Sequence, residues 1–156
     1  MPLFTSRLVP VFVAKTANET VTSSATLQND DHLALAVSAS STYLVNLFLI
    51  IDGSLAGDFK MGWTGPAGAT MDWVIAAQGT GATTTNGNQS FAYQTLATTD
   101  NAGTIGAGSK LVIRPQGTLV TSTTAGTLQL QWAQNASDAT ATTLYSGSWL
   151  RLERVV

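Results

Sequence analysis

The sequence predicts an all-β protein, a two-sheet antiparallel sandwich of the jelly-roll type. Short runs rich in Val, Ile, Thr and aromatic residues recur along the whole chain of 156 residues, and such runs favour strands. Gly, Asn, Asp and Pro separate the runs, at the spacing typical of sandwiches and jelly rolls. No segment has the repeat of apolar residues that a long amphipathic helix needs.

Each expected strand is an apolar run that ends at a turn sequence. In chain order, the strands are expected at residues 8–14, 19–27, 32–38, 42–51, 58–64, 70–77, 90–95, 110–114, 117–121, 128–134 and 142–155. The turn sequences between them are Asn29-Asp30-Asp31, Asp52-Gly53, Gly65-Pro66, Asn86-Gly87, Asp100-Asn101 and Pro115-Gln116-Gly117. Their residues favour turns because they accept positive φ values, fix φ or bond to their own backbone.

The strand expected at residues 42–51 is apolar on both faces. In a parallel sheet such a strand is ordinary, but this sequence offers no crossover helices to cover the second face. Another subunit is the simplest cover. We therefore expect Tyr43, Val45 and Leu47 at a subunit interface.

The strand expected at residues 142–155 runs almost to the last residue of the sequence. Side chains alternate along a strand, so two leucines face one way while Trp149, Arg151 and Glu153 face the other. Trp and Arg are enriched at the centres of protein interfaces. This second face is therefore expected to contact another subunit as well.

Composition narrows the possible partners. The formal net charge is −2 and the basic residues are scattered, so nucleic acid is not an expected partner. Cysteine is absent, which excludes a disulfide framework and a thiolate metal site. The longest apolar stretch, residues 43–51, is too short to span a bilayer, and no signal-peptide pattern precedes it, so no membrane association is expected.

The length predicts one domain with its own core. We expect residues 1–15 to form an N-terminal arm and residues 16–156 to form the jelly-roll domain. The arm carries apolar residues and a basic residue that are candidates for attachment to a partner. They are Leu3, Phe4, Arg7, Leu8, Val9, Val11 and Phe12.

The sequence contains a single histidine, His32. A catalytic interpretation would make it a general base for a serine nucleophile, but no Gly-x-Ser-x-Gly motif accompanies it. It is better explained as a residue beside a turn. Asp30 and Asp31 supply oxygen ligands for a hard cation, although the spacing of a calcium loop is missing and two adjacent aspartates are common in turns.

Glycoside hydrolysis requires two carboxylates about 5–10 Å apart. Several pairs can be drawn from Asp52, Asp58, Asp72 and Glu153, and nothing in the sequence selects one. The glycine-rich run at residues 103–110 lacks the order of Gly, Lys and Ser that a phosphate-binding loop needs. The sequence therefore predicts no catalytic residue, no cofactor and no metal site.

Aromatic and low-complexity segments complete the pattern. The tryptophans Trp63, Trp73, Trp132 and Trp149 fit a sandwich core or an interface better than a sugar-binding face. The Gly- and Thr-rich segment at residues 79–89 cannot form a core, and we expect an exposed loop there.

An ordered set of segments carries a family resemblance. The segments are KTANETVTSS (residues 15–24), TLQNDD (26–31), YLVNLFLI (43–50), GDFKMGW (57–63), GPAGATMDW (65–73), QWAQN (131–135) and GSWLRL (147–152). Together they resemble modules in virion proteins of tailed bacteriophages, especially those of actinobacterial hosts. Such modules are similar to the C1q/TNF-type jelly roll, which forms compact homotrimers with the terminal strand near the threefold axis.

The resemblance implies a structural protein of the virion. Tyr43, Val45, Leu47, Trp149, Arg151 and Glu153 would then form the trimer interface. Because the sequence holds little besides the module, the expected role is a trimeric head decoration protein that binds the major capsid protein through residues 1–15. The alternative is a tail-tip or tail-fibre knob that holds a host-surface glycan, and a more distant one is a glycan-active enzyme.

Overall fold

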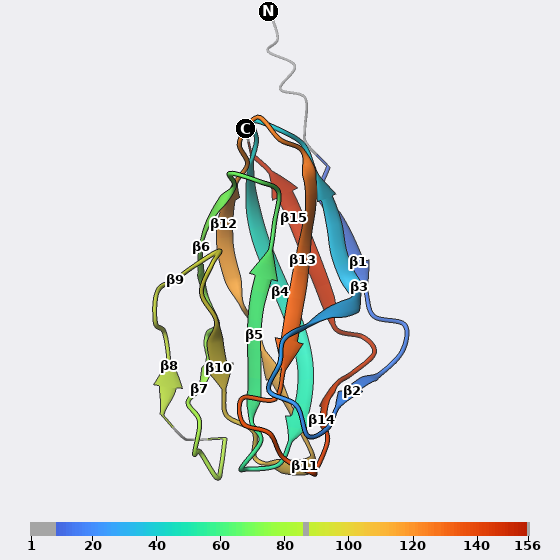
Figure 1. Ribbon diagram of the computed structural model, residues 1–156, viewed down its shortest axis with the longest axis vertical. Helices are drawn as coiled ribbons and strands as arrows, with labels where there is room; N and C mark the ends of the chain where they lie inside the picture. Colours follow the sequence, from blue (N-terminus) through green and yellow to red (C-terminus); the bar gives the residue numbers. More distant parts are fainter. Residues whose placement is uncertain (1–8, 86–87, 156) are drawn as a thin grey trace, which may run out of the picture.

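The computed structural model describes residues 9–85 and 88–155, and every regular element in these residues is a β-strand. Two main antiparallel sheets face each other along the length of the molecule (Figure 1). The expected all-β, two-sheet antiparallel sandwich is therefore confirmed. None of the described residues belongs to a helix that is long and apolar enough to span a membrane.

The larger sheet is built around the long strand β4. Its main path runs β1 (Val11–Ala14), β15 (Trp149–Arg154), β4 (Thr42–Gly53), β12 (Gln116–Val120), β6 (Thr70–Val74) and β9 (Gln94–Thr95). The second half of β4 also pairs with β11 (Gly106–Ile113) and β14 (Thr142–Leu144), and β14 pairs with β2 (Glu19–Val21). One strand therefore spans the sheet from end to end.

The smaller sheet covers the inner face of the larger one. Its strands lie in the order β10 (Asp100–Ala102), β5 (Phe59–Thr64), β13 (Gly126–Ala133) and β3 (Gln28–Val37). A separate pair, β7 (Ala77–Gln78) and β8 (Gln89–Ser90), lies at the ends of the Gly- and Thr-rich segment.

The strand pairing is nested along the chain. β1 pairs with β15, β3 with β13, and β4 with β12, all antiparallel. A chain that folds back on itself in this way and then wraps into two layers gives the jelly-roll arrangement. The first and last strands consequently lie side by side in one sheet (Figure 1).

Aromatic side chains fill the space between the sheets. Trp132 and Phe59 stack with their ring centroids 5.6 Å apart, and both are fully buried. Trp63 of the smaller sheet meets Trp73 of the larger sheet edge to face, with the centroids 6.4 Å apart. Three of the four tryptophans are thus core residues, as the sequence predicted.

The turn predicted at Asn29-Asp30-Asp31 is wrong, because these residues lie inside β3. Asp30 is buried, and its carboxylate accepts hydrogen bonds from the backbone N–H groups of His32 and Leu33. The pairing of β3 with β13 shifts register close to this point. The aspartate therefore stabilises an irregularity within a strand and does not end one.

Other predicted boundaries also differ from the structure, and the turn predicted at Asp52-Gly53, for example, is the end of β4. The strand expected at residues 142–155 is divided into β14 and β15 by a short turn, where Gly147 has a φ of 84°. Ser148 in this turn is buried, and its hydroxyl accepts a hydrogen bond from the backbone N–H of Ile50. The turn predicted at Asp100-Asn101 is part of β10, which pairs with β5.

The expected arm ends inside the sandwich. Residues 11–14 form β1, which pairs with β15 along its whole length, and the backbone N–H of Lys15 donates a hydrogen bond to the carbonyl oxygen of Ser148. The edge strand of the larger sheet thus belongs to the jelly roll. A boundary at residue 15 is too late for an arm that leaves the domain.

Candidate functional site

The outward side of the larger sheet carries the candidate site and is called here the outer face. Paired residues on antiparallel strands lie on the same face of a sheet, so the register identifies neighbours across it. One row runs from Phe12 to Arg151, Asn46, Gln116 and Val74, from one edge of the sheet towards the other.

Two neighbouring rows complete the outer face. Glu153 is paired with Leu44, which is followed across the sheet by Thr118 and Asp72. On the other side of the first row, Trp149 is paired with Phe48, and their rings stack with the centroids 6.0 Å apart and the planes 8° apart.

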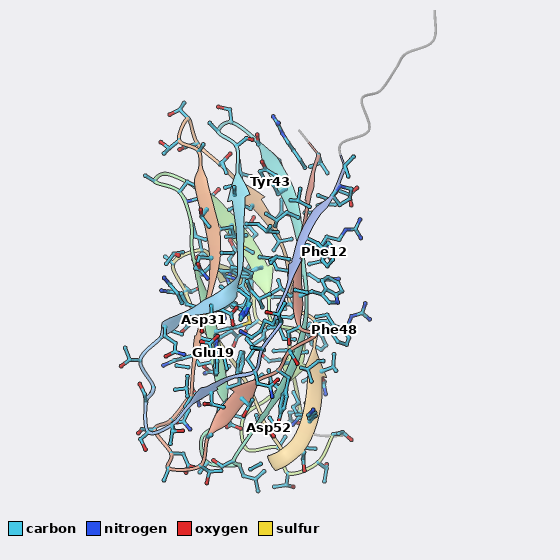
Figure 2. The ribbon with its side chains drawn as sticks, turned by 90° about the vertical axis from the view of Figure 1, so that its right-hand side faces the viewer. Phe12, Glu19, Asp31, Tyr43, Phe48 and Asp52 are labelled. Carbon is cyan, nitrogen blue, oxygen red and sulfur yellow. The ribbon has the colours of Figure 1, made fainter. Side chains whose placement is uncertain are left out.

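Apolar side chains gather on the outer face near β1, β15 and β4. Phe12, Leu44, Phe48 and Trp149 form this apolar patch, and Figure 2 shows Phe12 and Phe48 on the same side of the molecule. Phe12 is 68% exposed and Leu44 is 41% exposed. Grouped exposed apolar side chains are typical of interaction surfaces, whereas single ones are normal on any protein.

A charge pair lies among these apolar residues, since Arg151 is paired with Phe12 and Glu153 is paired with Leu44. Arg151 Nη2 and Glu153 Oε2 are 3.0 Å apart, and both side chains are about half exposed. An ion pair in this setting contributes little to the stability of the single chain, about 0–1 kcal/mol. Arginine is itself enriched at protein interfaces.

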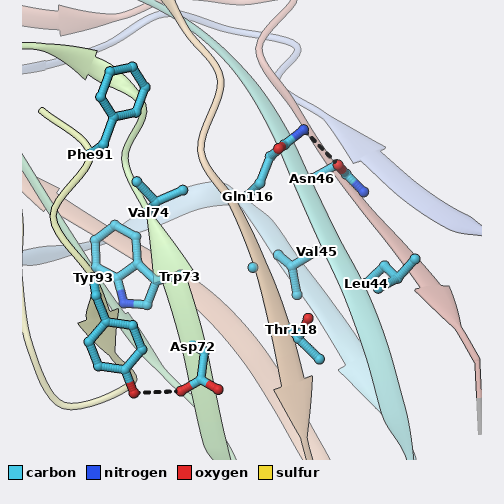
Figure 3. A pocket seen from close by; sticks show the side chains of 11 residues that line it. Leu44, Val45, Asn46, Asp72, Trp73, Val74, Phe91, Tyr93, Gln116 and Thr118 are labelled. Atoms are coloured by element: carbon cyan, nitrogen blue, oxygen red, sulfur yellow. Dashed lines mark hydrogen bonds between the residues drawn. The ribbon is translucent and has the colours of Figure 1, made fainter. Parts of the chain in front are cut away.

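A groove of about 610 Å³ lies beside the apolar patch, over β4, β12 and β6 (Figure 3). Its floor includes Asn46 and Gln116, and its wall is formed by Phe91 and Tyr93, each 70% exposed. Leu44 belongs to both the patch and the groove. The groove therefore combines exposed aromatic rings with amide groups.

Tyr93 is held by a carboxylate in the groove. Its hydroxyl donates a hydrogen bond to Asp72 Oδ1 at 2.8 Å (Figure 3). This bond raises the pKa of Tyr93 above its ordinary value, because the hydroxyl must keep its proton to donate to the carboxylate. Behind it, Trp73 Nε1 donates to the carbonyl oxygen of Thr95 at 2.8 Å, which fastens β9 to β6.

The structure corrects half of the predicted trimer interface. Tyr43, Val45 and Leu47 are buried within the single chain, because the odd-numbered residues of β4 face the smaller sheet. Figure 2 shows Tyr43 between the two layers. They present no exposed surface, and the partly exposed residues of β4 are even-numbered, Leu44 among them.

Trp149, Arg151 and Glu153 lie together on the outer face, as their alternation indicated. Whether a second subunit contacts them stays a prediction.

The predicted attachment residues fall into two groups. Leu3, Phe4, Arg7 and Leu8 lie outside the described residues. Val9, Val11 and Phe12 are exposed, and the last two belong to β1. Their contact with a capsid stays a prediction.

The candidate catalytic carboxylates are divided between different parts of the molecule. Asp52 and Asp58 are buried, and burial raises the pKa of Asp58 above its ordinary value. Asp52 accepts hydrogen bonds from Tyr145 Oη and from the backbone N–H of Gly108, both at 2.8 Å. Asp72 lies on the outer face instead. Within residues 9–85 and 88–155, no group of three His, Cys, Asp or Glu side chains is placed to hold a metal ion.

His32 lacks the second hydrogen bond that orients a catalytic imidazole, because its Nδ1 has no hydrogen-bond partner among the described residues. Its Nε2 lies 3.1 Å from Thr16 Oγ1, in an exposed contact. We expect His32→Ala to change the free energy of unfolding by less than about 0.5–1 kcal/mol, because surface substitutions rarely do more. Thermal unfolding would check the stability, and capsid binding or host adsorption would check the function. Loss of either function in a folded variant would contradict this interpretation.

Sequence reasoning missed the groove. Phe91 and Tyr93 are separated by one residue in a polar segment, and this alternation was the available signal. Nothing local indicated that the segment would lie over β6, because that position depends on the pairing of β9 with Asp72 and Trp73.

No protein-family model and no curated protein matches the chain. Among solved structures, it is similar to the tripod (BppUct-A-L) from the baseplate of bacteriophage Tuc2009, with 15% identity and a TM-score of 0.44, covering 99% of this chain and 68% of that one. It is also similar to the Gx strain structure and the VP2 subviral particle of infectious bursal disease virus. The Gx strain structure has 10% identity and a TM-score of 0.24, covering 96% of this chain and 38% of that one. The VP2 subviral particle has 11% identity and a TM-score of 0.24, covering 96% of this chain and 37% of that one. All three TM-scores are below 0.5, so these similarities carry no argument about the function of this chain.

Proposed function

We propose that this chain is a non-enzymatic structural protein of a tailed-bacteriophage virion, a homotrimer that decorates and stabilises the capsid. The observation that carries the proposal is the outer face, where an apolar patch and a balanced charge pair lie on a broad sheet. A surface of this kind supports association with protein. The resemblance of the sequence to virion modules of tailed bacteriophages is the reason for proposing that the protein belongs to a phage particle.

The same face explains how copies would associate. Phe12, Leu44, Phe48 and Trp149 would supply the apolar contacts, with Arg151 and Glu153 among them. Aromatic residues and arginine are enriched among the few residues that carry most of the binding energy at interfaces. In a closed ring of three the contact is heterologous, so one part of this face on each copy would bind a different part of the face on the next copy, and no free end is left.

Attachment to the shell would be multivalent. Three N-terminal segments in one trimer bind several capsid subunits at once, and weak contacts then add up to a high overall affinity. Val9 lies just before β1 and is exposed, so its apolar side chain would be available for this attachment.

Deletion of residues 1–10 tests the attachment, because it leaves β1 intact. A deletion to residue 14 would remove an edge strand along with the attachment residues. We expect the shortened protein to stay folded and trimeric but to lose binding to purified heads in a sedimentation assay. Unchanged affinity for heads would contradict attachment through this segment.

Copy number tests the place on the particle. A decoration protein is expected in hundreds of copies on the head, as measured by quantitative mass spectrometry of purified virions and by immunogold labelling. A few copies confined to the tail would overturn the decoration role.

The groove favours one other function, a tail knob that binds a host-surface glycan. Phe91 and Tyr93 offer exposed rings, while Asn46, Gln116 and Asp72 offer hydrogen-bonding groups. Sites for small ligands combine apolar walls with a few convergent polar groups in this way. Tyr93→Ala would then abolish glycan adsorption, and Leu55→Ala, at an exposed position outside the groove, would not.

A further inference from the structure

A buried cluster of one lysine and two carboxylates lies at the junction of β1, β2 and β3. Lys15 Nζ is 2.5 Å from Asp30 Oδ2 and 2.8 Å from Glu19 Oε2. The side chains of Lys15 and Asp30 are 0% exposed, and that of Glu19 is 11% exposed. The proposed virion function uses none of these three groups.

Burying these ions is costly. Removing a carboxylate and an ammonium from water carries a large desolvation penalty for each ion, which their mutual attraction often fails to recover. A neutral amide made from the same atoms would carry no such penalty. The position of the cluster therefore favours a reaction that removes both charges.

The backbone holds the amine in place. The N–H of Lys15 donates to the carbonyl oxygen of Ser148 at 2.8 Å, and the N–H of Gly147 donates to the carbonyl oxygen of Lys15 at 3.0 Å. Two reacting groups that are kept in contact react as though at a very high concentration.

The carboxylate of Asp30 is already arranged for attack. Its Oδ1 accepts hydrogen bonds from the backbone N–H groups of His32 at 2.9 Å and Leu33 at 2.7 Å, while Oδ2 faces the amine. Two fixed N–H donors on one carboxyl oxygen would stabilise the negative charge that develops there when a nucleophile adds to the carbon.

Glu19 is placed to move protons. Its Oε2 accepts a hydrogen bond from Lys15 Nζ and another, at 3.1 Å, from the backbone N–H of Asp31. Its Oε1 accepts a hydrogen bond from Gln28 Nε2 at 2.9 Å. Figure 2 shows Glu19 close to Asp31, and these bonds fix its carboxylate beside the amine.

We propose that Lys15 and Asp30 form an intramolecular isopeptide bond, with Glu19 as the proton-transferring residue. Glu19 first transfers one proton from the Lys15 ammonium to Asp30 Oδ2, which leaves a neutral amine beside a neutral carboxyl group. The lone pair of the amine attacks Asp30 Cγ, the Nζ–Cγ bond forms and a negative charge develops on Oδ1. Glu19 then carries a second proton from the nitrogen to Oδ2, the Cγ–Oδ2 bond breaks, water leaves, and the carbonyl bond to Oδ1 forms again. An ammonium and a carboxylate thus become one amide and one water, with no oxidation or reduction.

The bond would tie the end of β1 to β3. It closes a loop between residues 15 and 30, and a covalent loop stabilises a fold chiefly by restricting the unfolded chain. The edge strand β1, which is held otherwise by its pairing with β15, would then resist being pulled from the sheet.

Mass spectrometry of the whole folded protein, denatured only for the measurement, tests the bond directly. The mass should be lower than that of the sequence by one water, about 18 Da. Trypsin should fail to cut after Lys15, so residues 8–60 should appear as one peptide that lacks one water. Cleavage of this peptide after Glu19 should leave the two resulting fragments joined, because the bond between residues 15 and 30 spans the cleavage position.

Variants locate the reaction. Lys15→Arg should give the full mass, and so should Glu19→Gln, with circular dichroism showing that each variant is folded. Glu19→Asp, which keeps a carboxylate one methylene further away, should react more slowly. Lys60→Arg is the matched control, because Lys60 donates to the backbone carbonyl of Ala25 rather than to a carboxylate, and this variant should still lose water.

Full mass for the unaltered protein, with separate tryptic peptides 8–15 and 16–60, would overturn the proposal. Loss of water confined to peptide 16–60 would also overturn it, because it would indicate a cyclised aspartate in place of a bond to Lys15. Loss of water in folded Glu19→Gln at the original rate would overturn the role of Glu19.

Discussion

Trp132→Ala is expected to lower the free energy of unfolding by about 3–5 kcal/mol. Trp132 lies in β13, is fully buried and stacks on Phe59. Alanine would leave a large cavity between the two sheets, which the surrounding strands could fill only in part. Because domains are stable by only about 5–15 kcal/mol, the variant would be close to unfolding. Urea denaturation followed by fluorescence or circular dichroism would measure the change.

Phe91→Ala is the control for this experiment. It also removes an aromatic ring, but this ring is exposed in the groove. The expected change in the free energy of unfolding is within about 0.5 kcal/mol. Equal losses in the two variants would show that the space between the sheets is not the centre of stability.

Trp149→Ala is expected to weaken the proposed trimer by about 2 kcal/mol or more per site. The Trp149 ring lies flat on Phe48 in the apolar patch, and it would be an anchor in the centre of the contact. Light scattering should give three times the 16.2 kDa chain mass for the unaltered protein at micromolar concentration. The variant should dissociate as it is diluted. A monomer for the unaltered protein would rule out the trimer.

Leu55→Ala is the matched control for Trp149→Ala. Leu55 is an exposed apolar residue that follows β4 and does not belong to the apolar patch. The trimer should keep its stability in this variant. Thermal unfolding of both variants would show whether the single chains stay folded, which separates loss of association from loss of structure.

The apolar alternation within the chain was enough to predict the class of fold. Runs such as residues 42–51 and 58–64 are recognisable because β-branched and aromatic residues dominate them, and their ends are marked by Gly, Pro or Asp. The alternation also placed Trp149, Arg151 and Glu153 on one face of the last strand. Periodicity is a local property, so the sequence alone determines it.

Local patterns failed where a distant partner decided the conformation. The residues Asn29-Asp30-Asp31 have the composition of a turn but lie in β3, where Lys15 binds the Asp30 carboxylate and β13 pairs with the strand. The prediction of an interface at Tyr43, Val45 and Leu47 of β4 failed for a related reason. Both faces of that strand are apolar, so the pattern could not tell which one would face the core.

What the sequence by itself determined is the all-β class, the approximate positions of most long strands and the alternation of side chains along each. Only the tertiary structure decided which strands pair, and hence that Lys15, Glu19 and Asp30 meet in one buried cluster. The same pairing placed Phe91 and Tyr93 over Asp72 to form the groove. Side-chain alternation follows from the geometry of a single strand, whereas these sites depend on contacts between segments that are far apart in the chain.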